Sequence, residues 1–145
     1  MCGSACMGAA DMGGMSRSKG QRGERDAAAL LRELTGHDVQ RRVRQHAGDA
    51  DLVGLPGWSI EVKFYALATP SLVAGWWRQC VEQARREGTA PLLLYRLNRQ
   101  PWRAVWPAAV HGAGGRGLYN TSLEEALQSD PSTWRTMSSI SSGTG

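Results

Sequence analysis

The chain has 145 residues, of which 41% are hydrophobic, and its formal net charge is +4. This length fits one domain with room for tails, and the hydrophobic share is sufficient for a core. No apolar run approaches the length of a membrane-spanning helix, three cysteines do not make a disulfide framework, and the N-terminus does not resemble a secretory signal. We therefore expect a protein of a reducing compartment that has no membrane partner.

The predicted elements begin with residues 1–15, a Gly-, Ala- and Met-rich extension that we expect to be disordered. Apolar residues at helical spacing then predict a helix over 20–35. Residues 38–45 are predicted to form a strand with Val39 and Val43 directed inward.

The next predicted strands, 51–55 and 58–64, form a β-hairpin. Its loop has two or three residues, and the choice fixes which side chains face one another, because a one-residue slip exchanges the two faces of a strand. Pro56 suits the second position of a type I turn, and Gly57 suits the left-handed residue that follows. We therefore predict a three-residue loop over 55–57.

The three-residue loop would bring three charged side chains to one face of the hairpin. It places Asp51 opposite Glu61, and Lys63 lies two residues after Glu61 on the same face. The other face carries the apolar Ile60 and Val62. Two carboxylates beside an ammonium can hold a divalent metal ion near a scissile phosphate. A solvated strand face with an exposed ion pair is the alternative interpretation.

A second helix, 70–87, is predicted with Thr69 as its N-terminal cap. Strands over 91–96 and 102–106 follow, so the order of core elements is α-β-β-β-α-β-β. Residues 111–145 are expected to be a flexible link, a short helix and a mobile Ser/Gly tail.

Positive charge is concentrated on both sides of the hairpin. Residues 16–50 carry eight Arg or Lys against five acids, and residues 85–103 carry five Arg against one acid. Such segments suit a polyanion such as DNA. Ordinary solvated arginines explain the charge equally well, so charge alone leaves both interpretations open.

Together these features resemble the PD-(D/E)xK nuclease superfamily, above all its Holliday-junction-resolvase branch and the small nucleases of that type in phages and prophages. The resemblance covers about residues 16–107. It rests on the order of short motifs: Lys19-Gly20, Gly23-Glu24-Arg25, Asp51-Leu-Val-Gly, Glu61-Val-Lys63, Trp77-Arg-Gln79, Gln83-Ala84, and Tyr95-Arg96 before Pro101-Trp102. It implies an α/β, restriction-endonuclease-like core (α-β-β-β-α-β), a mixed sheet flanked by helices, within a nuclease domain over residues 16–110.

The resemblance further implies a metal-dependent DNA endonuclease. Asp51, Glu61 and Glu24 would hold Mg²⁺ or Mn²⁺, and Lys63 would align or activate the attacking water. Asp49 is an alternative to Asp51, and Glu24 has the alternative role of a first-turn acid favoured by the helix dipole. DNA would be the partner, branched DNA included, for a homodimer in the cytoplasm of a bacterium or a phage-infected host. A non-catalytic DNA-binding module on the same fold is the competing hypothesis.

Several other side chains are candidates for contact with DNA, each with a plain alternative as a solvated polar or charged residue. They are Lys19, Arg22, Arg25, Arg42, Arg44, Gln79 and Gln83. Tryptophans can stack on bases, but we expect Trp76, Trp77, Trp102 and Trp106 to pack in the core or against a second subunit. None of the three histidines has a nucleophile at a sequence spacing that would indicate a catalytic pair. This argues against a Ser/His or Cys/His hydrolase.

Overall fold

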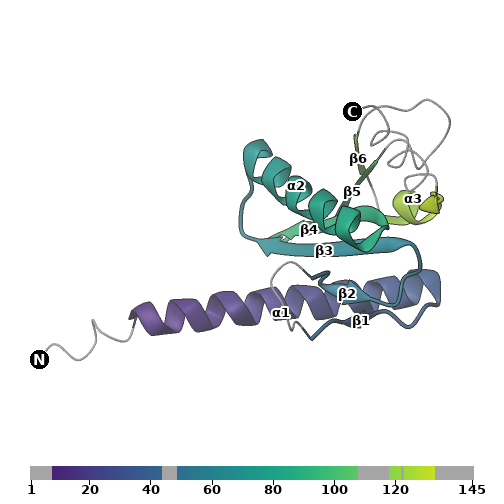
Figure 1. Ribbon diagram of the computed structural model, residues 1–145. Helices are drawn as coiled ribbons and strands as arrows, with labels where there is room; N and C mark the ends of the chain where they lie inside the picture. Colours follow the sequence, from purple (N-terminus) through teal and green to yellow (C-terminus); the bar gives the residue numbers. More distant parts are fainter. Residues whose placement is uncertain (1–7, 44–48, 108–117, 122, 133–145) are drawn as a thin grey trace, which may run out of the picture.

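A computed structural model describes residues 8–43, 49–107, 118–121 and 123–132 (Figure 1). The elements follow in the order α1 (Gly8–Thr35), β1 (Gln40–Arg41), β2 (Leu52–Val53), β3 (Trp58–Tyr65), α2 (Pro70–Glu87), β4 (Ala90–Leu97), β5 (Arg103–Pro107), β6 (Leu118–Thr121) and α3 (Leu123–Leu127). The strands form one sheet in chain order. Strands β3 and β4 are parallel, and all other neighbours are antiparallel. The expected α/β class with a mixed sheet is therefore confirmed.

Helices cover both faces of this sheet, with α1 on one side and α2 on the other (Figure 1). The larger core cluster joins α1 and α3 to the sheet and includes Leu31, Ile60 and Trp106. The smaller cluster lies beneath α2 and includes Trp76 and Cys80. Strand β4 contributes to both clusters, with Leu92 and Leu94 in the larger and Leu93 and Tyr95 in the smaller, because its side chains alternate between the faces.

Helix α2 begins and ends where the sequence predicts. The side chain of Thr69 accepts a hydrogen bond from the backbone N–H of Leu72 at 3.2 Å, and Pro70 opens the first turn. Gly88 ends the helix in the left-handed conformation, with φ of 68°. The helix forms the crossover that two parallel strands require, and so it connects β3 to β4 over one face of the sheet.

The N-terminal elements differ from the expectation in two ways. Helix α1 begins at Gly8 and not near residue 20, so the extension expected to be disordered is helical from that residue on. Alanine and methionine favour helix strongly enough to continue it through the glycines. Strand β1 has two residues, and Val43, which we expected to point inward, is 80% exposed. Residues 44–48 lie outside the described residues, as do 1–7.

The C-terminal part contains a strand that the sequence analysis missed. Strand β6 pairs with β5 in antiparallel register, from Ala104↔Thr121 to Pro107↔Leu118. Helix α3 falls inside the expected short helix. The expected link at 111–117 and the tail from 133 on lie outside the described residues. Within the described ranges, no helix combines the length and apolar character that a membrane crossing needs.

Candidate active site

The turn between β2 and β3 fixes which side chains face one another. Leu52 is the partner of Ile60, and the backbone N–H of Asp51 donates to Ile60 O at 2.9 Å. Gly57 has φ of 83°, the left-handed conformation that a glycine adopts without a steric penalty. The three-residue loop is thus confirmed. The same register places Asp51 opposite Glu61. The Cβ atoms of residues paired in this way lie about 5 Å apart.

A backbone donor holds Asp51, which immediately precedes β2. Its Oδ2 accepts a hydrogen bond from the N–H of Val62 at 2.8 Å, and the residue is 1% exposed. The carboxylate therefore receives a donor that belongs to the strand carrying Glu61. Asp49, the alternative ligand, is less deeply buried. This environment favours Asp51 as the acid of the site.

Glu61 and Lys63 form the second part of the cluster. The Nζ atom of Lys63 lies 3.1 Å from Oε1 of Glu61, and Glu61 is 2% exposed. The Lys63 side chain is 19% exposed, so it is partly open to solvent. The interpretation of this face as a solvated strand surface is wrong, because both carboxylates are buried.

Gln83 of α2 contacts Glu61 and the backbone beside Asp51. The amide orientation that gives each of its atoms a complementary partner directs Nε2 to Oε2 of Glu61 at 3.1 Å. In this orientation Oε1 accepts hydrogen bonds from Ser59 Oγ at 3.0 Å and from the N–H of Ala50 at 2.9 Å. Gln83 is 1% exposed, so its amide serves the interior of the site.

Glu24 lies where α1 contacts the sheet. It is buried near the sheet because α1 approaches β3 closely at Gly23, where an added Cβ would lie 2.8 Å from Phe64 Cβ. Its Oε2 accepts a short hydrogen bond from Nε of Arg41 on β1, with which it forms an ion pair. In the part of the chain that the structure describes, no group of three or more His, Cys, Asp or Glu side chains is placed to hold a metal ion. The structure therefore brings Asp51, Glu61 and Lys63 together but does not add Glu24 to a three-acid cluster.

The comparison with protein families adds an independent observation. The family model described as "Phage putative PDDEXK endonuclease" matches residues 15–141. The chain belongs to this family. Among solved structures, it is similar to Hjc of Archaeoglobus fulgidus, a Holliday junction resolvase from an archaeal hyperthermophile. The identity is 21%, the match covers 79% of this chain and 98% of that one, and the TM-score is 0.47. No curated protein sequence matches the chain.

Cys80 lies beneath the acids of this PDDEXK family member. Its Sγ is 3.9 Å from Ser59 O, and the residue is fully buried. Burial raises the pKa of the Cys80 thiol far above its ordinary value, and the negative charge of Glu61 raises it further. The thiol therefore stays protonated, which excludes it as a thiolate nucleophile.

The candidate DNA contacts of the PDDEXK protein lie in several places. Lys19 and Arg96 both contact the ring of Phe64, at 4.8 and 5.6 Å from its centroid. Arg22 and Arg25 are exposed on α1, Arg42 pairs with Glu87 at 3.3 Å, Gln79 is exposed on α2, and Arg44 is outside the described residues. Sequence reasoning missed Arg96, because only the parallel register of β3 and β4 makes it the neighbour of Phe64.

The four tryptophans considered for base stacking pack in or against the core of the PDDEXK protein. Trp76 and Trp106 are buried in the two clusters, and Trp77 and Trp102 pack against them. Trp76 also contacts the rings of Tyr65 and Tyr95, with centroids 4.8 and 6.0 Å apart. The preference for packing over base stacking is confirmed for these four.

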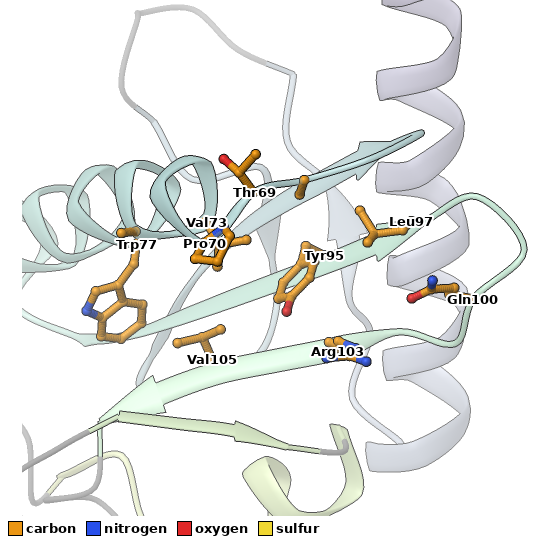
Figure 2. Close-up of a pocket in the computed structure, with 11 residues that line it drawn as sticks. Thr69, Pro70, Val73, Trp77, Tyr95, Leu97, Gln100, Arg103 and Val105 are labelled. Carbon is orange, nitrogen blue, oxygen red and sulfur yellow. The ribbon is translucent and has the colours of Figure 1, made fainter.

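A cavity of about 490 Å³ is separate from the acids. Figure 2 shows Val73 and Trp77 projecting from α2, Val105 and Arg103 on β5, and Tyr95 on the intervening strand β4. Its lining is largely apolar and includes none of the acids described above. The cavity is therefore not the place where the acids could act.

Proposed function

We propose that this chain is a divalent-metal-dependent endonuclease that hydrolyses phosphodiester bonds in DNA, with Asp51 and Glu61 as metal ligands. The observation that carries the proposal is the pair of buried carboxylates on opposed strands, with the ammonium of Lys63 beside one of them. Membership of the PDDEXK family supports it.

The donor set fits a hard divalent cation. Both ligands are carboxylates, whose oxygens are the atoms that Mg²⁺ and Mn²⁺ prefer. Both carboxylates are buried, and the ammonium of Lys63 forms an ion pair with Glu61. A bound cation would supply Lewis-acid stabilisation of the phosphate charge and lower the pKa of a coordinated water.

The protein's own groups account for the remaining requirements of the reaction. An oxygen of water must bond to phosphorus while the bond from phosphorus to the leaving oxygen breaks, and negative charge grows on the phosphoryl oxygens. The partly exposed ammonium of Lys63 is suited to hold the water and to stabilise that charge. Glu61 keeps Lys63 in place through the 3.1 Å contact.

The basic pair Lys19 and Arg96 supports the DNA part of the proposal. Both cations surround Phe64, the residue that follows Lys63 on β3, and no ion pair is seen for either of them among the described residues. Cationic side chains beside the site attract the phosphates of DNA. We propose that they bind the DNA backbone beyond the cleaved bond.

The finer features of the function follow from the resemblance of the motifs to junction-resolving nucleases. We propose Mg²⁺ or Mn²⁺ as the ion, branched DNA as one substrate, DNA recombination in a phage or prophage as the setting, and a homodimer as the acting form, because two strands of a junction are cut in a symmetric way.

A cleavage assay tests the proposal. Labelled four-way junction, linear duplex and single strand are incubated with wild type, Asp51→Asn and Glu61→Gln, with Mg²⁺ or with EDTA. We expect Mg²⁺-dependent cleavage by wild type and a loss of at least about 100-fold in each variant, since each removes a charge that holds the ion. If wild type cuts no substrate, or the variants cut as fast as wild type, the enzyme proposal fails.

The alternative function, a non-catalytic DNA-binding module, rests on the basic pair alone. It predicts that DNA binding depends steeply on salt and is the same with and without Mg²⁺. Binding measured in EDTA beside the cleavage assay separates the two functions.

A further inference from the structure

We infer that Gln83 is a positioning residue that sets the distance and orientation between the two metal-binding acids. This inference rests on the proposed function, because it concerns how the site of Asp51 and Glu61 is held. Sequence reasoning placed Gln83 among the possible DNA contacts, but the structure buries it behind the acids.

The hydrogen bonds of Gln83 reach both acidic segments. Its Nε2 donates to Oε2 of Glu61 at 3.1 Å, while its Oε1 accepts from the N–H of Ala50 at 2.9 Å. Ala50 immediately precedes Asp51 in the chain. One side chain of α2 therefore connects the carboxylate of Glu61 to the backbone beside the opposing acid.

The position of the amide is itself fixed. Ser59 Oγ lies 3.0 Å from the amide and anchors it from the strand that bears Glu61. Gln83 is buried within α2, whose ends are defined by Thr69 and Gly88. A buried amide with partners on three sides has little freedom, so it restrains the groups to which it is bonded.

The two oxygens of Glu61 are divided between two donors. Oε1 faces the ammonium of Lys63, and Oε2 faces the amide of Gln83. These contacts determine the plane of the carboxylate and hence the direction of its remaining lone pairs. Groups that orient a metal ligand in this way typically contribute a factor of about 10–100 to metal affinity or activity.

The experiment compares Gln83→Met with wild type in two measurements. Mg²⁺ and Mn²⁺ binding is measured by calorimetry without DNA, and cleavage is measured as a function of metal concentration. Methionine keeps the length of the side chain and removes its polar atoms. We expect the metal Kd to rise about 10-fold or more, with kcat recovering toward wild type at saturating metal.

A matched control and a milder variant accompany it. Glu82→Met introduces methionine at the neighbouring exposed position of α2 and should leave metal affinity unchanged. Gln83→Asn keeps the amide but shortens it by one methylene, and we expect it to share the loss of metal affinity. If Gln83→Met does not fold, Gln83→Asn provides the test.

DNA binding in EDTA separates positioning from direct contact. Because Gln83 is buried, we expect its variants to bind DNA as wild type does when metal is absent. Metal affinity equal to wild type in a folded Gln83 variant overturns the inference while leaving the nuclease proposal intact. Absence of metal binding and of cleavage in wild type instead overturns the proposed function.

Discussion

The ammonium of Lys63 lies 3.1 Å from Oε1 of Glu61, two residues earlier on the same strand. The contact follows from the period of a β-strand, which directs residues two apart to the same face. It places a positive charge beside one of the two opposed carboxylates. Under the proposed function, the carboxylates would hold the metal ion and the ammonium would face the phosphate.

Replacement of Lys63 by methionine separates these two roles. We expect Lys63→Met to lower kcat by about 100- to 1000-fold, the usual cost of losing one group that stabilises transition-state charge. Mg²⁺ affinity should not weaken, because the variant removes a positive charge that competes with the ion. Calorimetry and single-turnover cleavage measure the two effects. A parallel loss of Mg²⁺ binding would show that Lys63 supports the ligands and not the reaction.

Glu24 of α1 forms an ion pair with Arg41 of β1. From this contact we expect Glu24→Gln and Arg41→Gln to lower the free energy of unfolding by similar amounts, about 0.5–1 kcal/mol. A double-mutant cycle in urea measures their coupling. Calorimetry with Mg²⁺ should show little change for either variant. A large loss of Mg²⁺ affinity in Glu24→Gln alone would instead make Glu24 a third metal ligand.

Two glycines of α1 form a matched pair for testing the approach of this helix to the sheet. An added Cβ at Gly23 would lie 2.8 Å from Phe64 Cβ, whereas one at Gly20 would meet nothing within 4 Å. We expect Gly23→Ala to destabilise the protein by about 1–3 kcal/mol through overpacking. Gly20→Ala should stabilise it by up to about 1 kcal/mol, because alanine favours helix. Urea unfolding followed by circular dichroism compares them, and equal effects would contradict the close packing.

The cations around Phe64 should govern the salt dependence of DNA binding. Lys19→Met and Arg96→Met are each expected to lower the slope of log Kobs against log salt by about 1, as expected for the loss of one phosphate contact. Arg32→Met is the control and should leave the slope unchanged. Arg32 lies in the last turn of α1, where its Nη1 donates to Val39 O at 2.6 Å. Fluorescence anisotropy in EDTA at several salt concentrations measures the slopes. Unchanged slopes for both variants would place the DNA elsewhere.

The sequence by itself determined the features that depend on local chemistry. The turn residues Pro56 and Gly57 gave the correct hairpin register, because only a left-handed residue after a type I turn closes a three-residue loop. Thr69, Pro70 and Gly88 gave the limits of α2 through hydrogen bonding and backbone conformation. Alternation along β3 placed Glu61 and Lys63 on one face.

Only the tertiary structure decided the features that need contacts between distant segments. Nothing near Gln83 in the sequence distinguishes it from the exposed Gln79, and only the packing of α2 on β3 brings its amide to Glu61. The partner of Glu24 depends on the pairing of β1 with β2, which directs Arg41 toward α1. Short motifs therefore specified the acids and the lysine, whereas the groups that orient them came from elements far apart in the chain.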